Sequence, residues 1–349
     1  MHRWQTPLRG HGRSAGRSTC RRPHHRPLRR SSRFGPRVTG RRVVALGGGH
    51  GLAVSLAALK LITDHVTAVV TVADDGGSSG RLRAEFDVLP PGDLRMALAA
   101  LCEDSTWGLT WASVMQHRFG GEGPLSGHAL GNLLIVALWD LLEDPVEGLD
   151  LVGTLLHARG RVLPMANEPL RIEADILGHD PAYPDVTFTV RGQHVVAATT
   201  GRVDAIRLRP PNPLSCPDSV AAVRDAEWVI LGPGSWFTSV LPHVLVPELR
   251  EALVTTSAKR LLNLNLDHGR GETRGFRAVD LLASLSKHAP GLTLDVVLAD
   301  PSSVDDVPAV LGAAADLGAE LVTMPVAAMR HSGKHDALRL AAAYRDLFG

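Results

Sequence analysis

The sequence has little cysteine and no long apolar run. Its three cysteines, Cys20, Cys102 and Cys216, form no CxxC pair, which excludes a disulfide framework and a four-cysteine zinc site. Such cysteine usage is typical of a reducing compartment, so we expect a cytoplasmic protein. No apolar stretch approaches the roughly 20 residues that span a bilayer, and we therefore expect no membrane span.

Acidic residues and lysine are absent from residues 1–42, which carry 13 arginines. The remainder, 43–349, holds 24 basic and 36 acidic residues, a net charge of −12. Nucleic-acid binding requires a basic surface, so we expect no nucleic-acid partner for this acidic body. Residues 1–41 have almost no apolar groups to bury and are predicted to be a disordered, arginine-rich tail. A transit peptide and a nucleic-acid-binding arm are the alternatives for the tail.

Beyond the tail, apolar strands alternate with helical patterns. A strand at 43–46 precedes the glycine loop 47–51, a helical pattern and a second strand at 66–72. This order forms a βαβ unit of a parallel sheet. We therefore predict a single α/β domain at 42–349, with a Rossmann-like, doubly wound, mostly parallel sheet and a helical insertion around 94–158.

Three glycine-rich loops, each after a strand, carry the candidate binding residues. The first contains Gly47, Gly48, Gly49 and Gly51. Its backbone N–H groups and the N-terminus of the following helix can hold a phosphate. The strict GxGxxG spacing fails at Leu52 and no Gly-Lys-Ser/Thr sequence occurs, so the standard dinucleotide and Walker A motifs are absent. A plain tight turn is the alternative.

The second loop begins with Asp74 and Asp75, directly after the second strand. A Rossmann-like protein places there the carboxylate that accepts ribose hydroxyls. Two adjacent carboxylates could instead hold Mg²⁺ beside a diphosphate, and an Asp-Gly pair is also a turn signal. Further backbone donors and hydroxyls for the same ligand are expected from Gly76, Gly77, Ser78, Ser79 and Gly80.

The third loop, Gly232 to Ser239, follows a strand at 228–231. Two strand–glycine loops in one sheet imply a ligand crevice at the carboxyl ends of the strands, near a topological switch point. Ser235 or Thr238 could donate to phosphate. Phe237 could stack on a base, although aromatic residues are more often core residues.

Other segments carry weaker signals. Asn132 and Asn167 are candidate ligand residues, for which helix capping is the alternative, and Asp93 is predicted to cap a helix over 94–102. The segment His331–His335 has the spacing of metal-binding histidines, but a third ligand is missing and we expect no metal there.

The runs LGGGHG, ADDGGSSGR, PPGDLR, GHALGN, NEPL, GPGSWFTS and GETRGF follow one another as in the gluconeogenesis-factor (YvcK/CofD-like) family, which is related to the 2-phospho-L-lactate transferases. The sequence resembles this family from about residue 42 to the C-terminus. The resemblance implies a Rossmann-like fold, a cytosolic location and binding of UDP-sugars or related dinucleotides. It also implies a role in linking gluconeogenic carbon metabolism to cell-envelope synthesis and cell shape.

On this resemblance, Gly47–Gly51 and Asp74–Gly80 hold the phosphates and ribose, while Gly232, Gly234 and the residues up to Thr238 close over the nucleotide. The sequence departs from the family pattern at two such positions: His50 stands where Thr is usual, and Phe237 where Tyr is common. These departures leave the identity of the ligand open.

Two functions are therefore expected from the sequence. One is a regulator that binds a nucleotide sugar, and the other is a transferase that acts on a diphospho-nucleotide donor with Mg²⁺; no cofactor is firmly expected. The broken GxGxxG pattern and the lack of a catalytic His or Lys that can be placed disfavour an NAD-dependent dehydrogenase. The expected partners are a small nucleotide ligand, proteins of envelope synthesis and further copies of the chain in a homo-oligomer.

Overall fold

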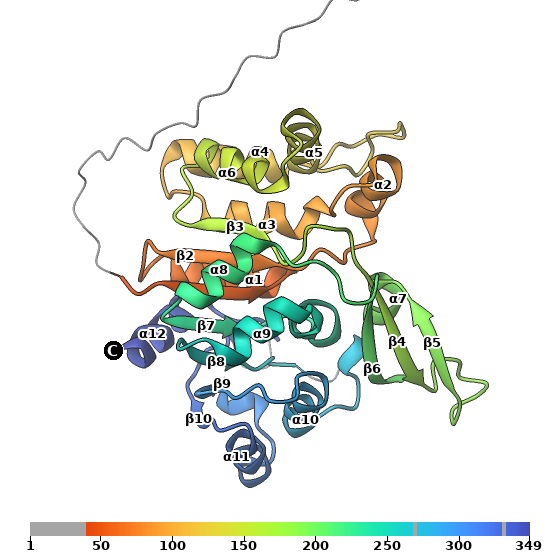
Figure 1. Ribbon diagram of the computed structural model, residues 1–349, viewed down its shortest axis with the longest axis vertical. Helices are drawn as coiled ribbons and strands as arrows, with labels where there is room; N and C mark the ends of the chain where they lie inside the picture. Colours follow the sequence, from red (N-terminus) through yellow and green to blue (C-terminus); the bar gives the residue numbers. More distant parts are fainter. Residues whose placement is uncertain (1–39, 268–270, 330–332) are drawn as a thin grey trace, which may run out of the picture. The chain divides into compact units, whose positions relative to one another are not determined.

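Within the described residues of the computed structural model, seven strands form one parallel sheet (Figure 1). The structure describes residues 40–267, 271–329 and 333–349, so the predicted tail lies outside it except for its last two residues. The strands are β1 (Val43–Gly47), β2 (Val66–Val70), β3 (Arg161–Pro164), β7 (Trp228–Leu231), β8 (Lys259–Asn263), β9 (Val296–Ala299) and β10 (Glu320–Thr323).

The chain builds this sheet in two directions from β1. The strand order is β10-β9-β8-β7-β1-β2-β3, so β1 pairs in parallel with both β2 and β7. The winding reverses between β1 and β7, and in such sheets ligands bind beside this switch point at the carboxyl ends of the strands. The predicted Rossmann-like, doubly wound, mostly parallel sheet is confirmed.

Helices flank the sheet, which is why its inner strands are apolar throughout. All residues of β1, β7 and β9 are buried, as is usual for parallel strands between helical layers. The helix α1 (Gly49–Leu59) packs against α3 (Pro91–Leu101) and α12 (Ala337–Phe348). The helices α8 (Pro217–Asp225) and α9 (Pro247–Thr255) pack against each other and lie in front of the sheet in Figure 1.

A group of helices fills the chain between β2 and β3. Besides α3, these are α2 (Gly77–Phe86), α4 (Thr106–Gln116), α5 (Leu130–Leu142) and α6 (Pro145–Leu155). One prediction was wrong here, because residues 77–80 are not a loop but the first turn of α2. Gly80 makes this turn possible, since a Cβ on it would lie 2.1 Å from the Asp75 carbonyl oxygen.

The later part of the chain adds short helices around the strands. They are η1 (Trp236–Val240, a π-helix), η2 (Leu241–Leu245), α10 (Ala278–His288), η3 (Gly271–Thr273), η4 (Pro301–Ser303) and α11 (Val307–Asp316). None of the helices in the described parts of the chain is long and apolar enough to cross a membrane.

A small antiparallel sheet stands beside the main one, at the right in Figure 1. Its order is β5-β4-β6, with β4 (Arg171–Leu177), β5 (Thr187–Arg191) and β6 (Arg202–Arg209), and the short helix α7 (Gln193–Ala197) follows β5. Alternation along β4 buries Ile172, Ala174 and Ile176, so one face of the small sheet joins the core and the other carries charged residues.

Candidate functional site

The first and third glycine loops lie against each other at the switch point. A Cβ built on Gly51 would lie 2.3 Å from the Pro233 carbonyl oxygen, and one on Gly234 would lie 3.6 Å from the Gly48 carbonyl oxygen. At Gly51 only glycine allows the two backbones to approach this closely, whereas the separation at Gly234 is an ordinary contact. The structure therefore brings together Gly47–Gly51 and the loop that begins at Gly232, as the sequence predicted.

At this junction Gly48 is closely surrounded by other residues, whereas Gly49 borders open space. A Cβ on Gly48 would meet Thr71, Asp93 and Ser239, the closest atom at 2.5 Å. Gly49 has a φ of +58°, and nothing lies within 4 Å of the position its Cβ would take. The N-cap Gly48 has no side chain, and the Gly49 N–H is already taken by Asp93. Only the following N–H groups of this first turn are left for an anion.

A pair of carboxylates lies beside the first glycine loop, and sequence reasoning did not count one of them, Asp93, among the candidate ligand residues. Because α3 begins at Pro91, Asp93 sits inside the first turn of α3 rather than capping it. Its carboxylate accepts the Gly49 N–H, and burial together with the charge of Asp74 raises the pKa of Asp93 to about 7. Asp74 approaches from the other side: its Oδ2 lies 3.2 Å from where a Cβ on Gly92 would be. The sequence signal that could have pointed to Asp93 is its place in the run Pro90-Pro91-Gly92-Asp93.

Asp75 has a structural role instead of the expected ligand contact. Its Oδ2 accepts the N–H of Gln193 at 3.1 Å and its Oδ1 accepts that of His194 at 3.0 Å. Both oxygens thus cap the N-terminus of α7 and tie the small sheet to the second loop. Asp74 is therefore the member of the pair that faces the glycine loop.

A chain of buried polar side chains lies behind the second loop. Arg95 Nε donates to Asn132 Oδ1 at 2.8 Å, and Asn132 Nδ2 donates to Ser78 Oγ at 3.0 Å. Since Ser78 Oγ already accepts this bond, its proton can go to His128 Nδ1, 3.0 Å away, and burial lowers the pKa of His128. The predicted ligand residues Ser78 and Asn132 are therefore bonded to each other and orient Arg95.

Several polar atoms near the carboxyl ends of the strands are buried without a partner in the described part of the chain. They are Thr71 Oγ1, Arg95 Nη1, Asn263 Oδ1 and Glu272 Oε2. Unpaired buried polar atoms are rare in folded proteins, because each costs about 1–3 kcal/mol. A bound ligand or water would satisfy them.

The remaining residues of the second loop surround the start of α2. Gly76 is its N-cap, no side chain caps this terminus, and Gly77 is exposed with a φ of +48°. Ser79 is buried, and its Oγ accepts the Gly92 N–H at 3.0 Å. The Gly76 N–H already donates to Asp74 Oδ1 at 2.9 Å. Gly77 can therefore offer its N–H to a ligand, whereas Ser79 holds the start of α3 in place.

The expectation that Phe237 stacks on a base is wrong in this structure. Phe237 has no exposed area, and its ring packs edge-on against Phe276 at a centroid distance of 5.4 Å. Because η1 turns the side chain inward, the ring has no free face. Ser235, just before η1, is exposed and remains available as a donor.

Glu272, the second residue that sequence reasoning missed, holds η1 in place. Its Oε1 accepts the Phe237 N–H at 2.9 Å, and Thr238, itself buried, also donates its hydroxyl to this carboxylate. Burial raises the pKa of Glu272 to about 7. Thr238 is therefore bonded within the protein instead of facing a phosphate. Asn265 clamps Gly234 through two hydrogen bonds of 3.2 and 2.8 Å.

Asn167 and the C-terminal histidines lie apart from this junction or outside the description. Asn167 is exposed and lines a cavity of about 400 Å³ with Phe86, Trp139 and Pro169, and none of the glycine loops contributes to that lining. His331 lies outside the described residues. Among those described, no group of three or more His, Cys, Asp or Glu side chains could hold a metal ion.

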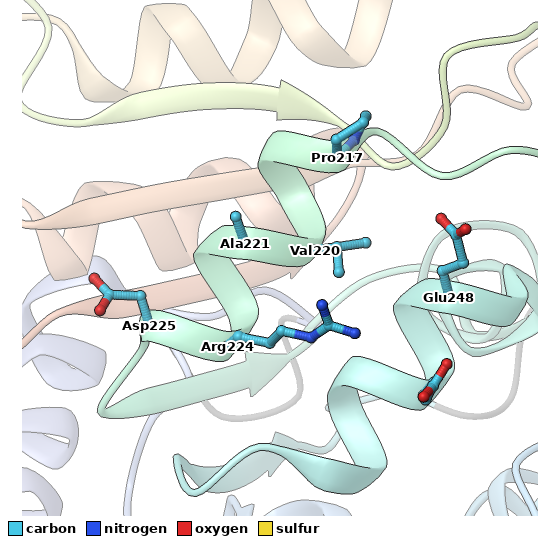
Figure 2. Close-up of a pocket in the computed structure, with 7 residues that line it drawn as sticks. Pro217, Val220, Ala221, Arg224, Asp225 and Glu248 are labelled. Carbon is cyan, nitrogen blue, oxygen red and sulfur yellow. The ribbon is translucent and has the colours of Figure 1, made fainter.

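An open groove lies between α8 and α9 (Figure 2). Its volume is about 710 Å³. Arg224 of α8 and Glu248 of α9 line it together with apolar Val220. None of the three glycine loops lines this groove, so the groove is separate from the junction.

Comparison with known proteins agrees with this architecture. The family model described as 2-phospho-L-lactate transferase CofD matches residues 43–334. A putative gluconeogenesis factor of Mycobacterium leprae is 54% identical over 262 residues, covering 75% of this chain and 73% of that protein. A gluconeogenesis factor of Listeria monocytogenes is 35% identical over 263 residues, covering 75% and 78%.

A crystal structure of a UPF0052-family protein from Bacillus halodurans superposes with a TM-score of 0.77 at 31% identity, covering 88% of this chain and 99% of that one. The region matched by the family model, 43–334, contains the seven-stranded sheet, the switch point and all three glycine loops. The chain therefore belongs to the CofD family, among its gluconeogenesis-factor (YvcK/CofD-like) members.

Proposed function

We propose that the protein binds a nucleotide sugar of the UDP type at the junction of its glycine loops. We further propose that it acts as a regulator linking gluconeogenic carbon metabolism to cell-envelope synthesis and cell shape. The observation that carries the binding proposal is the meeting of Gly47–Gly51 and the Gly232 loop at the switch point, with Gly49 open to space. The regulatory role rests on the likeness to gluconeogenesis factors.

Three further features support a diphosphate at this place. The N-caps of α1 and α2, Gly48 and Gly76, have no side chains. Asp93 takes the Gly49 N–H and Asp74 takes the Gly76 N–H, but the remaining N–H groups of both first turns can attract an anion. Arg95 offers a buried Nη1 without a partner, and guanidinium groups bind phosphate strongly. Ser235 is exposed beside the junction. Partner proteins of envelope synthesis and a homo-oligomeric state stay predictions.

The carboxylate pair supports a second candidate, a transferase acting on a diphospho-nucleotide donor. Asp74 and Asp93 lie close enough to raise the pKa of Asp93, as expected where a divalent cation would relieve repulsion. Hard oxygen ligands of this kind fit Mg²⁺ when phosphate oxygens and water complete the shell. Bound there, Mg²⁺ would neutralise charge on the diphosphate, while Asp74 and Asp93 would orient it beside the N-terminus of α1.

A thermal-shift screen tests the first proposal. The full chain is heated with UDP-sugars, GDP derivatives and NAD(P), each with and without Mg²⁺. A ligand at 100 times its Kd adds about 2.7 kcal/mol of stability, so UDP-sugars should raise the melting temperature by several degrees. A shift with NAD(P) alone would contradict the proposal. Stabilisation by GDP derivatives only with Mg²⁺ would favour the transferase instead.

A further inference from the structure

The outer face of the small antiparallel sheet is rich in arginine. Strand pairing sets Arg171 directly opposite Arg209, and Glu173 opposite both Arg191 and Arg207. Directly opposed like charges in a sheet are destabilising. The body of the protein is acidic overall, so this local excess of positive charge calls for a physical reason.

Acidic side chains neutralise only part of this face. Glu173, which is 3% exposed, accepts Arg191 Nε at 2.6 Å and Arg209 Nε at 2.7 Å. Asp175 binds Arg207 through both of its oxygens. Within the described residues no acidic side chain forms an ion pair with Arg171.

A cavity of about 480 Å³ gathers four of the guanidinium-bearing side chains. Its lining consists of Arg83, Arg171, Arg191 and Arg209 with Asp75, Asp87 and backbone or apolar groups from α2, Pro169 and Pro210. Arg83 comes from α2 and donates to the Leu170 carbonyl oxygen. Burial lowers the pKa of Arg83, and the charge of Arg171 lowers it further, so these two cations lie close together.

The carboxylates at this cavity offset only part of its positive charge: Asp75 and Asp87 line it and, with Asp74, attract Arg83. Asp75 accepts two N–H groups of α7, and Glu173 is shared by two arginines. Asp87 is exposed at the end of α2. The cavity therefore keeps an uncompensated positive charge on Arg171, next to Arg83 and opposite Arg209.

We propose that this cavity, separate from the glycine-loop junction, binds a phosphate-bearing small molecule through Arg83, Arg171 and Arg209. Planar guanidinium groups bind phosphate oxygens in a bidentate manner. A phosphate between Arg171 and Arg209 removes their mutual repulsion, and Glu173 holds Arg209 in a fixed position beforehand. The volume falls within the range of small-ligand pockets.

The geometry favours a small molecule over an acidic protein segment. The guanidinium groups converge on one cavity between α2 and the small sheet, whereas a docking strip for a peptide would spread them along the surface. Arg207, two residues before Arg209 on β6 and outside the cavity lining, is paired with Asp175. This proposal does not depend on the nucleotide-sugar proposal, because Arg83, Arg171 and Arg209 lie outside the three glycine loops. Asp75 and Gly80 of the second loop line the same cavity but are not proposed as ligands.

Isothermal titration of the full chain with inorganic phosphate and pyrophosphate tests the site. Arg171→Gln should weaken pyrophosphate binding at least tenfold. The matched control, Arg250→Gln, removes an exposed arginine on α9 and should change the affinity less than twofold. Because the glycine loops could also take pyrophosphate, the titrations are repeated with Gly49→Val in both backgrounds. Arg171→Gln should still weaken pyrophosphate binding when Gly49→Val is also present.

Melting curves provide a second readout that also checks folding. Without phosphate, Arg171→Gln should melt at the same or a higher temperature than the wild type, because it removes a like-charge contact. Pyrophosphate should then raise the melting temperature of the wild type more than that of the variant. Equal pyrophosphate affinity in both proteins would overturn the site. Binding of a hexaglutamate peptide that depends on Arg171 and is tighter than that of pyrophosphate would assign the face to an acidic protein segment and equally overturn it.

Discussion

The side chain of Asp93 acquires its chemistry from its neighbours. An aspartate in an unfolded chain has a pKa near 4, whereas burial and Asp74 raise the pKa of Asp93 to about 7 in the fold. Between these values the folded state binds more protons than the unfolded state. Its contribution to stability is therefore complete below about pH 4 and is lost as the pH rises to about 7.

Asp93→Asn should abolish this pH dependence. We expect the free energy of unfolding of the variant, relative to wild type, to increase between pH 5 and 8. The gain should be smaller than the ~1.4 kcal/mol per pKa unit of full linkage, since the half-buried group is partly solvated. Urea unfolding at pH 5, 6, 7 and 8 measures it.

Only the difference between the two proteins is diagnostic here. The pKa values of buried His243 and His335 are lowered to about 4, so their titration changes stability in the opposite direction between about pH 4 and 6.5. The control Asp316→Asn replaces an exposed carboxylate on α11. Parallel pH profiles for wild type and Asp93→Asn would contradict the raised pKa.

Gly49 is the residue through which the nucleotide site is tested. Gly49→Val would place a branched side chain in the open space at the N-terminus of α1, where the phosphate is proposed to bind. We expect UDP-sugar affinity to fall at least tenfold in titration calorimetry. A non-glycine residue at positive φ also costs about 1–2 kcal/mol of stability, so a control with the same backbone strain is required.

Gly291→Val provides that control. Gly291 has a φ of +84° and nothing within 4 Å of its Cβ position, but it lies after α10, outside the loops. It should lose a similar amount of stability and keep its affinity. If both variants bind UDP-sugar as tightly as the wild type does, the phosphate lies elsewhere.

At the scale of elements, the second loop leads into α2 and contacts both α3 and α7. Asp75 caps α7, while Asp74 turns toward Gly92 and the glycine loop. Asp74 and Asp75 are adjacent in the sequence but have different roles: Asp75 caps a helix, and Asp74 lies at the proposed ligand site.

Single substitutions should separate these two tasks. Asp75→Ala removes both cap bonds and should cost about 0.5–2 kcal/mol of stability, with a small effect on affinity. Asp74→Asn should leave the melting temperature within a degree or two and weaken binding of a Mg²⁺–nucleotide ligand by about 1.5–3 kcal/mol, as for loss of a charged acceptor. Paired melting and titration experiments decide this. A loss of stability in Asp74→Asn and a loss of affinity in Asp75→Ala would contradict this assignment.

At the scale of the whole molecule, the first described residues are held by contacts with Glu227. Arg41 pairs with Glu227 at 3.0 Å, and the Arg42 N–H donates to the same carboxylate at 2.9 Å. A chain that starts at Val38 retains both contacts and loses 11 arginines. We expect its melting temperature and UDP-sugar affinity to match those of the full chain. A drop of several degrees would show that residues 1–37 pack on the body.

Much of the architecture was predictable because it depends on local pattern. Apolar runs at 43–46 and 228–231, each followed by glycines, predicted two strands that end at ligand loops, and both strands are observed. A glycine-rich segment gives no helical signal by itself, so the start of α2 at Gly77 was missed. There the close approach of Gly80 to Asp75 decides the conformation.

The sequence by itself determined the parallel α/β class, the family and the loops that carry the candidate ligand residues, because strand periodicity and glycine positions are local properties. Only the tertiary structure decided which side chains face the ligand space. The inward turn of η1 buried Phe237, α7 engaged Asp75, and the packing of α3 against α1 brought Asp93 to Gly49. These contacts join segments far apart in the chain, and such distances close only when the sheet and its helices pack together.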